Sequence, residues 1–164
     1  KENYFASIQN PNYVSLGYNW RMSSITAALA LSQLQRLDTL IKMRQKNAKY
    51  LIKKLQKFKE IKFHLSPKGY VHVYQLFTIM LPNTKTRNEL SNFLTKKGIM
   101  SKIFFVAIHK TNFYKKLKSN YGDLSTTEDI CDRMLSLPMY PDLKETEMDF
   151  ISKSIEEFFA TRSK

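Results

Sequence analysis

Asn19 and Arg21 are the side chains of this sequence best suited to binding an anion. They belong to the run L-G-Y-N-W-R-M-S-S-I-T-A-A-L-A-L-S-Q-L, which starts at Leu16. An amide donates hydrogen bonds, and a guanidinium can bind a phosphate or carboxylate with two N–H groups at once. Ser23 or Ser24 can cap the helix that follows, and a helix N-terminus offers unpaired N–H groups and partial positive charge. From the residues alone, the simpler interpretation is a turn followed by a closely packed helix.

His109 is the second candidate for a binding residue, in the run I-H-K-T-N-F-Y-K-K. A lone histidine beside apolar residues is as often a packed side chain as a ligand, so both interpretations stay open. His72, Tyr74 and Phe104 or Phe105 are possible pocket walls, although packing in a sheet is the simpler explanation for each. No spacing of His, Cys and carboxylates predicts a metal site.

Four stretches of the chain resemble one family in order and in spacing. The run from Gly17 closely resembles the G-x-N-x-R-M-(S/D/T)-x-I-x-A-A-L-G-x-x-Q-L segment of the DegT family. Members of that family are pyridoxal-phosphate (PLP) sugar aminotransferases that act on nucleotide-linked keto-sugars. The other three stretches are V-H-V-Y-Q-L-F-T-I from Val71, I-H-K-T-N-F-Y-K-K from Ile108 and R-M-L-S-L-P-M-Y-P-D-L from Arg133.

The resemblance implies an α+β fold, the small C-terminal domain of a type I PLP-dependent transferase. A short antiparallel sheet packed with helices would follow a long linking helix. Residues 1–36 would be an irregular segment and a helix contributed to the PLP domain and the dimer interface, and residues 37–164 the small domain. Because the sequence starts with Lys1 and not with Met, we interpret it as a piece of a longer protein.

The resemblance also implies roles for the candidate residues. Asn19 would reach across a homodimer interface to the PLP phosphate of the neighbouring subunit, and Arg21 and His109 would contact the substrate. No catalytic residue is predicted here, because the lysine that binds PLP covalently lies in an upstream Ser-x-x-Lys stretch followed by Gly-Glu-Gly-Gly. The chain alone is therefore predicted to be inactive.

The partners implied are the missing N-terminal PLP domain, a second copy of the chain, a nucleotide-diphosphate keto-sugar and an amino donor, usually glutamate. Relatives commonly carry a proline or an acidic residue just before the histidine, where this sequence has Val106-Ala107. The identity of the sugar and of the nucleotide therefore stays open.

Two other functions are compatible with the sequence. A PLP-dependent sugar dehydratase shares the scaffold and differs at the lysine position, which is upstream. A basic binding module would fit the net charge of +13 and the pI of about 9.8. Lysines spread between Lys42 and Lys59 are, however, typical of a solvated helix face, and no zinc-finger spacing or RNA-binding aromatic motif is present.

Neither nucleic acid nor a membrane is predicted as a partner. No apolar run approaches the ~20 residues that a membrane-spanning helix needs. Cys131 is the single cysteine, so no intrachain disulfide can form. That usage is weak evidence for a reducing compartment, and the predicted location is the cytoplasm.

The apolar pattern predicts the elements that position these residues. Residues 24–58 repeat apolar side chains at steps of three and four, which predicts a helix. Such a helix would be roughly 50 Å long, so either it breaks near Arg36 to Asp38 or it spans two domains, as the resemblance favours. The predicted strands are 70–81, 99–106 and 135–140, with the first central and antiparallel to the second. Further helices are predicted from a capping box at Thr86–Glu89 to residue 97, at 113–117, from a capping box at Ser125–Glu128, and at 145–159.

Overall fold

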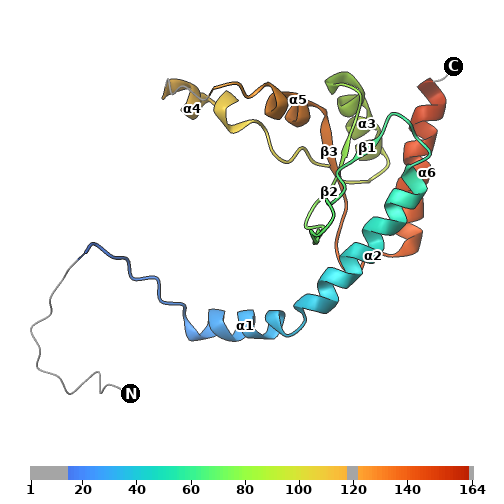
Figure 1. The fold of residues 1–164 in the computed structure, drawn as a ribbon. Coiled ribbons are helices and arrows are strands. Elements are labelled where there is room, and N and C mark those ends of the chain that lie inside the picture. The colour runs from blue at the N-terminus through green and yellow to red at the C-terminus, as the bar shows by residue number, and fades with distance from the viewer. Residues whose placement is uncertain (1–14, 118–121, 163–164) are drawn as a thin grey trace, which may run out of the picture. The chain divides into compact units, whose positions relative to one another are not determined.

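The computed structural model describes residues 15–117 and 122–162 (Figure 1). Contacts within the chain divide it into two compact units, residues 1–35 and residues 36–164. The predicted irregular segment before Tyr18 falls largely outside the described residues.

The described part of the first unit is an extended stretch that leads into helix α1 (Ser24–Leu34). The Ser23 hydroxyl accepts a hydrogen bond of 3.2 Å from the Thr26 N–H, so Ser23 is the N-cap, one of the two residues predicted for that role. All described residues of this unit are exposed, and α1 buries none of its side chains. Its alanines and leucines therefore offer an apolar surface and no core.

The second unit holds the rest of the secondary structure. Its elements are α2 (Leu37–Leu55), β1 (Lys62–Phe63), β2 (Phe77–Met80), α3 (Thr84–Lys96), the 3₁₀ turn η1 (Ile108–Lys110), α4 (Asn112–Lys116), α5 (Ser125–Arg133), β3 (Met134–Leu137) and α6 (Glu145–Arg162). The α+β fold is confirmed, as are the helices predicted near residues 113 and 145. For residues 24–58 the structure shows the first of the two alternatives, a break, because one helix ends at Leu34 and the next begins at Leu37. Among the described helices, none has the length and apolar character to cross a membrane.

Helices α2 and α6 lie side by side and bury their facing apolar side chains (Figure 1). Ala48, Leu51 and Leu55 of α2 have no exposed surface, and neither does Ile155 of α6. Their spacing of three to four residues places the α2 side chains on one face of the helix. The predicted apolar stripe is therefore the face that α2 turns to the core.

Lysines at the margin of this contact pair with acidic residues of α6. The N–O distances are 3.6 Å for Lys46–Glu145, 2.8 Å for Lys54–Asp149 and 2.6 Å for Lys57–Glu156. These pairs are exposed, so each contributes little to the free energy of unfolding. They nevertheless neutralise part of the positive charge that α2 carries.

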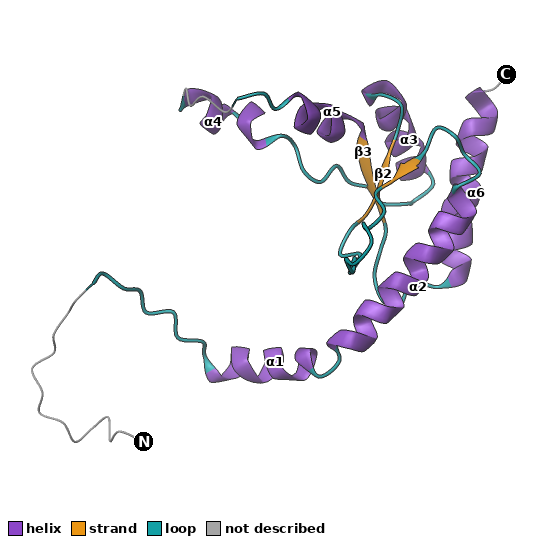
Figure 2. Ribbon diagram, viewed as in Figure 1, coloured by secondary structure: helices purple, strands orange, loops and turns teal. Residues whose placement is uncertain are grey.

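The sheet has the antiparallel order β1-β2-β3, which confirms the predicted central position of β2 (Figure 2). Residues opposite each other in register point to the same face. The core face therefore consists of two cross-strand pairs, Phe77–Leu137 and Ile79–Leu135, which pack on the helices. The other face carries Thr78 and Ser136, whose hydroxyl oxygens lie 2.8 Å apart. Strand β1 was not predicted.

Pro138 ends the pairing of β2 with β3. In the observed register Leu76 would lie opposite Pro138, and a proline has no N–H to donate to a ladder. The strand predicted over residues 70–81 is therefore confirmed only for Phe77–Met80, and the residues before it form a loop.

The strand predicted over residues 99–106 is wrong. This segment makes one antiparallel bridge, Lys102 with Ser136, on the outer edge of β3, and it does not pair with β2. Extending the bridge in one direction would meet Pro138. Extending it in the other would pass Met134, at which α5 gives way to β3. The strand available as a partner, β3, is therefore only four residues long.

Helix α3 begins earlier than its predicted capping box. Asn83 is the N-cap, and its side-chain oxygen accepts a 2.9 Å hydrogen bond from the Thr86 N–H. The capping box predicted at Thr86 is therefore wrong. The predicted end is confirmed, because Gly98 follows the C-cap Lys97 with a φ of 76°, a value that favours glycine.

Arg44 of α2 forms hydrogen bonds with two loops, the one before β2 and the one after β3. Its Nη1 donates to the backbone oxygens of Tyr74, Gln75 and Met139 at 3.1, 3.3 and 3.0 Å. Backbone carbonyls in loops lack a ladder partner and must find a donor elsewhere. One guanidinium therefore satisfies the loop before β2 and the loop after β3 together.

Asn47 does the same for the segment after Met139. This side chain is 5% exposed, and its Nδ2 donates to the backbone oxygens of Tyr140 and Pro141, both at 3.0 Å. Polar residues of α2 thus fix the loops, and its apolar residues pack against the sheet.

We predict that Asn47→Ala destabilises the second unit. The substitution leaves two carbonyl groups without their donor, which costs about 1–3 kcal/mol. Equilibrium denaturation with urea measures the change. Lys49→Ala, an exposed position two residues along the same helix, is the matched control and should change the free energy of unfolding little. Equal effects of the two substitutions would contradict the anchoring role of Asn47.

Candidate functional site

Asn19 and Arg21 lie in the exposed stretch before α1. Their neighbour Trp20 is 85% exposed, and its ring stacks on the ring of Tyr18 with centroids 5.2 Å apart. Ser23 caps the helix that follows, so this polar pair is followed within a few residues by a helix N-terminus. The donors of the loop and the partial positive charge of a helix N-terminus are both suited to an anion.

His109 belongs to the second unit, so the predicted binding residues fall on both units. It lies in the turn η1, and its side chain is 16% exposed. The His109 Nε2 atom is 2.8 Å from Oε1 of Glu128, the acidic residue in the first turn of α5. The other carboxylate oxygen, Oε2, is 2.7 Å from Nζ of Lys110.

The sequence did not predict Glu128 as a site residue, because its spacing from Ser125 resembles a capping box. That interpretation is wrong, since Leu124 is the N-cap of α5 and no side chain caps this helix. The Ser125 N–H instead donates to Oδ1 of Asp123 at 2.9 Å. The Glu128 carboxylate therefore points away from the helix end and holds two residues of η1.

The ion pair between Glu128 and Lys110 shifts the pKa of each group in the direction that favours its charged form. The hydrogen bonds from Lys110 and then His109 lower the pKa of Glu128, and the hydrogen bond to Glu128 raises the pKa of Lys110. Both groups are therefore charged throughout the neutral range. The arrangement docks η1 on α5 electrostatically.

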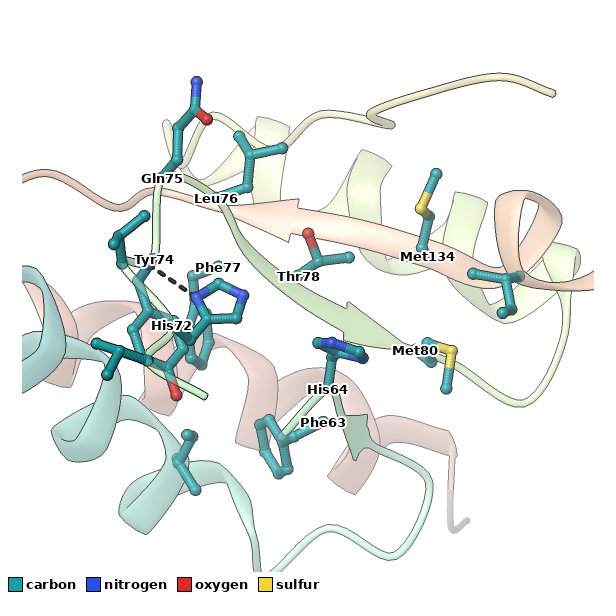
Figure 3. A pocket seen from close by; sticks show the side chains of 14 residues that line it. Phe63, His64, His72, Tyr74, Gln75, Leu76, Phe77, Thr78, Met80 and Met134 are labelled. Atoms are coloured by element: carbon teal, nitrogen blue, oxygen red, sulfur yellow. Dashed lines mark hydrogen bonds between the residues drawn. The ribbon is translucent and has the colours of Figure 1, made fainter. Parts of the chain in front are cut away.

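A cavity of about 620 Å³ lies beside β2, and His72 and Tyr74 line it together with Phe63, His64, Thr78 and Met80 (Figure 3). The Tyr74 N–H donates to His72 Nδ1 at 2.8 Å, so the second ring nitrogen of His72 holds the proton. The rings of His64 and His72 have centroids 6.1 Å apart. His72 and Tyr74 are therefore cavity walls in a loop, and not sheet residues as the simpler interpretation had it.

The loop that forms this wall is fixed from α2. Gln45 donates to the His72 backbone oxygen at 3.0 Å, and Arg44 donates to the Tyr74 oxygen. Tyr74 has a φ of 50°, a left-handed value that is uncommon for a residue other than glycine. The other predicted wall residues do not reach this cavity, because Phe104 lines a smaller one at β3 and Phe105 is 67% exposed.

Solved structures with this fold are sugar aminotransferases and their relatives. A DegT DnrJ EryC1 StrS aminotransferase from Brucella abortus is 29% identical, with a TM-score of 0.79 over 93% of this chain and 40% of that one. A putative sugar aminotransferase, Spr1654 from Streptococcus pneumoniae, was solved in a PMP form. It is 20% identical, with a TM-score of 0.76 over 90% of this chain and 37% of that one. The predicted type I PLP-transferase fold is thereby confirmed.

Residues 1–156 match the DegT/DnrJ/EryC1/StrS aminotransferase family, and the chain belongs to it. Among its relatives, the GDP-perosamine synthase of Escherichia coli O157:H7 is 29% identical over 147 residues, 90% of this chain and 39% of that protein. The chain thus spans about 40% of the length of the relatives it matches. The family predicted from the sequence motifs is confirmed.

We predict that the stabilising effect of the Glu128 contacts depends on pH. Since the folded-state pKa of Glu128 is lowered below its usual 4.5, the stabilisation is complete above that value and is lost as the pH falls through the lower folded value. Chemical denaturation of the wild type and Glu128→Gln should show a difference in the free energy of unfolding at pH 7 that shrinks towards pH 3. A difference that stays constant over that range would contradict the ion pairing.

Proposed function

We propose that the full-length protein is a PLP-dependent aminotransferase that moves an amino group, from glutamate, onto a nucleotide-linked keto-sugar. The observation that carries the proposal is the family match over residues 1–156, joined to relatives named for sugar aminotransfer and for perosamine synthesis. The product would be an amino sugar for a polysaccharide or glycan. This chain would be the C-terminal part, and the lysine that binds PLP covalently would lie upstream.

The exposed apolar residues of the first unit support a role in assembly. Trp20, Ile25 and Leu34 are each more than half exposed, and α1 buries no residue. Side chains of this kind gain free energy when another surface covers them. The proposed covers are the N-terminal PLP domain and a second copy of the protein, with residues 1–36 at the interface.

Asn19 is the proposed PLP contact. Its amide is exposed and precedes the capped N-terminus of α1, so the chemistry of this stretch fits a phosphate group. When bound, PLP supplies an electron sink for the carbanion chemistry of amino transfer. Asn19 would hold the phosphate of PLP in the neighbouring subunit of a homodimer.

Arg21 and His109 are the proposed substrate contacts. A guanidinium in an exposed loop can hold a diphosphate oxygen or a carboxylate with two hydrogen bonds. His109 would contribute from η1, where Glu128 holds its ring.

Cys131, an unpaired and half-buried thiol, supports the proposed cytoplasmic location.

The proposal is tested with the full-length protein, PLP and ¹⁵N-glutamate. Mass spectrometry should find the ¹⁵N label in the sugar when a panel of nucleotide-linked keto-sugars is offered. A product that has lost water and carries no label would identify the dehydratase instead. If PLP is bound and every keto-sugar of the panel is recovered unchanged and without label, the proposed reaction is contradicted.

We predict that Asn19→Ala in the full-length protein weakens PLP retention about 10–100-fold, because a hydrogen bond to a charged group contributes about 1.5–3 kcal/mol. The measurement is the fraction of PLP absorbance that survives dialysis at a series of PLP concentrations. Gln35→Ala removes an amide at the other end of α1 and is the matched control. Unchanged PLP affinity in Asn19→Ala would refute the assigned contact.

A further inference from the structure

Glu128 contacts two consecutive side chains of η1 with separate carboxylate oxygens. Oε1 lies 2.8 Å from His109 Nε2, and Oε2 lies 2.7 Å from Lys110 Nζ. One carboxylate on α5 therefore fixes both the ring of the predicted substrate residue and the turn that carries it.

Asp132, one helical turn further along α5, makes a weaker contact. Its Oδ2 atom lies 4.0 Å from Lys110 Nζ, and its side chain is more exposed than that of Glu128. The two acidic residues thus share a helix and a cation, but Glu128 binds that cation at 2.7 Å and lies 2.8 Å from the histidine ring. This difference supplies a matched control.

We propose that Glu128 is a positioning residue, which holds His109 by Nε2 and so sets the protonation and orientation of the ring that faces the keto-sugar nucleotide. A carboxylate only accepts hydrogen bonds, so the nitrogen beside it must carry the proton. Fixing one ring nitrogen defines the tautomer of a neutral histidine. The inference rests on the proposed function, because His109 enters it as a substrate contact.

The surroundings of His109 favour this role over a purely structural ion pair. The imidazole is 16% exposed, so water has limited access to replace the carboxylate. Lys110 binds the second oxygen of Glu128 and keeps the carboxylate charged and oriented. Misplacing a substrate-contacting group by about 1 Å can slow a reaction on the order of 100-fold.

The first test follows the ring directly in the full-length, PLP-loaded protein labelled with ¹⁵N-histidine. Long-range proton–nitrogen spectra at pH 8 should show His109 protonated at Nε2 in the wild type. Glu128→Ala should move the Nε2 resonance away from its wild-type position, whereas Asp132→Ala should leave the wild-type pattern. Glu128→Gln should retain it too, because the amide oxygen can still accept from Nε2–H.

The second test separates the two halves of turnover with a substrate found in the ¹⁵N-glutamate panel. In Glu128→Ala, kcat/KM for the keto-sugar nucleotide should fall about 10–100-fold, while the reaction with glutamate alone stays within twofold of the wild type. Glu128→Gln should recover most of the loss. Asp132→Ala should behave as the wild type in both halves.

An unchanged His109 spectrum in Glu128→Ala overturns the proposal, and so does an equal loss in both halves of turnover, which indicates a structural role. Circular dichroism of each variant identifies one that fails to fold, and Glu128→Met, which keeps the length of the side chain without its carboxylate, then takes the place of Glu128→Ala in both tests. A wild type that transfers no amino group refutes the proposed function, but the ring spectrum still decides whether Glu128 positions His109.

Discussion

Arg44 of α2 donates hydrogen bonds to the backbone of the loop before β2 and of the loop after β3. Asn47 donates to the second of these loops. Without these donors, the carbonyls of Tyr74, Gln75 and the segment from Met139 to Pro141 would lie against α2 unsatisfied. The free energy lost by an unpaired buried carbonyl is comparable to the gain from burying an apolar side chain. The docking of α2 therefore requires its polar residues as much as Leu51 and Leu55.

The same constraint shapes the cavity beside β2. Pro138 ends the ladder at Phe77, so residues 71–76 cannot continue as a strand and need other donors for their carbonyls. Arg44 and Gln45 supply these donors and hold the loop so that His72 and Tyr74 form a wall. The proline that ends the strand pairing and the side-chain donors of α2 thus together shape the wall of a cavity of about 620 Å³.

Charge is organised within the second unit in the same local manner. Lys54 pairs with Asp149 across the α2–α6 contact, and Lys110 pairs with Glu128 across the η1–α5 contact. The net charge of +13 is therefore a poor guide to function, because part of it serves to align elements. What distinguishes the first unit is that none of its described side chains is buried, which supports the proposal that another surface covers residues 15–35.

The sequence by itself determined the family, the α+β class and the helices with strong periodicity, because motif spacing and the three-to-four apolar step are local properties. It limited the cap of α1 to Ser23 or Ser24 and determined the Gly98 helix end for the same reason, and the structure shows Ser23 as the cap. Only the tertiary structure decided where strands end, since pairing depends on which residue lies opposite. It also decided that Glu128 binds His109 and does not cap α5. The spacing from Ser125 was compatible with either role, and only the fold brought η1 within reach of the carboxylate.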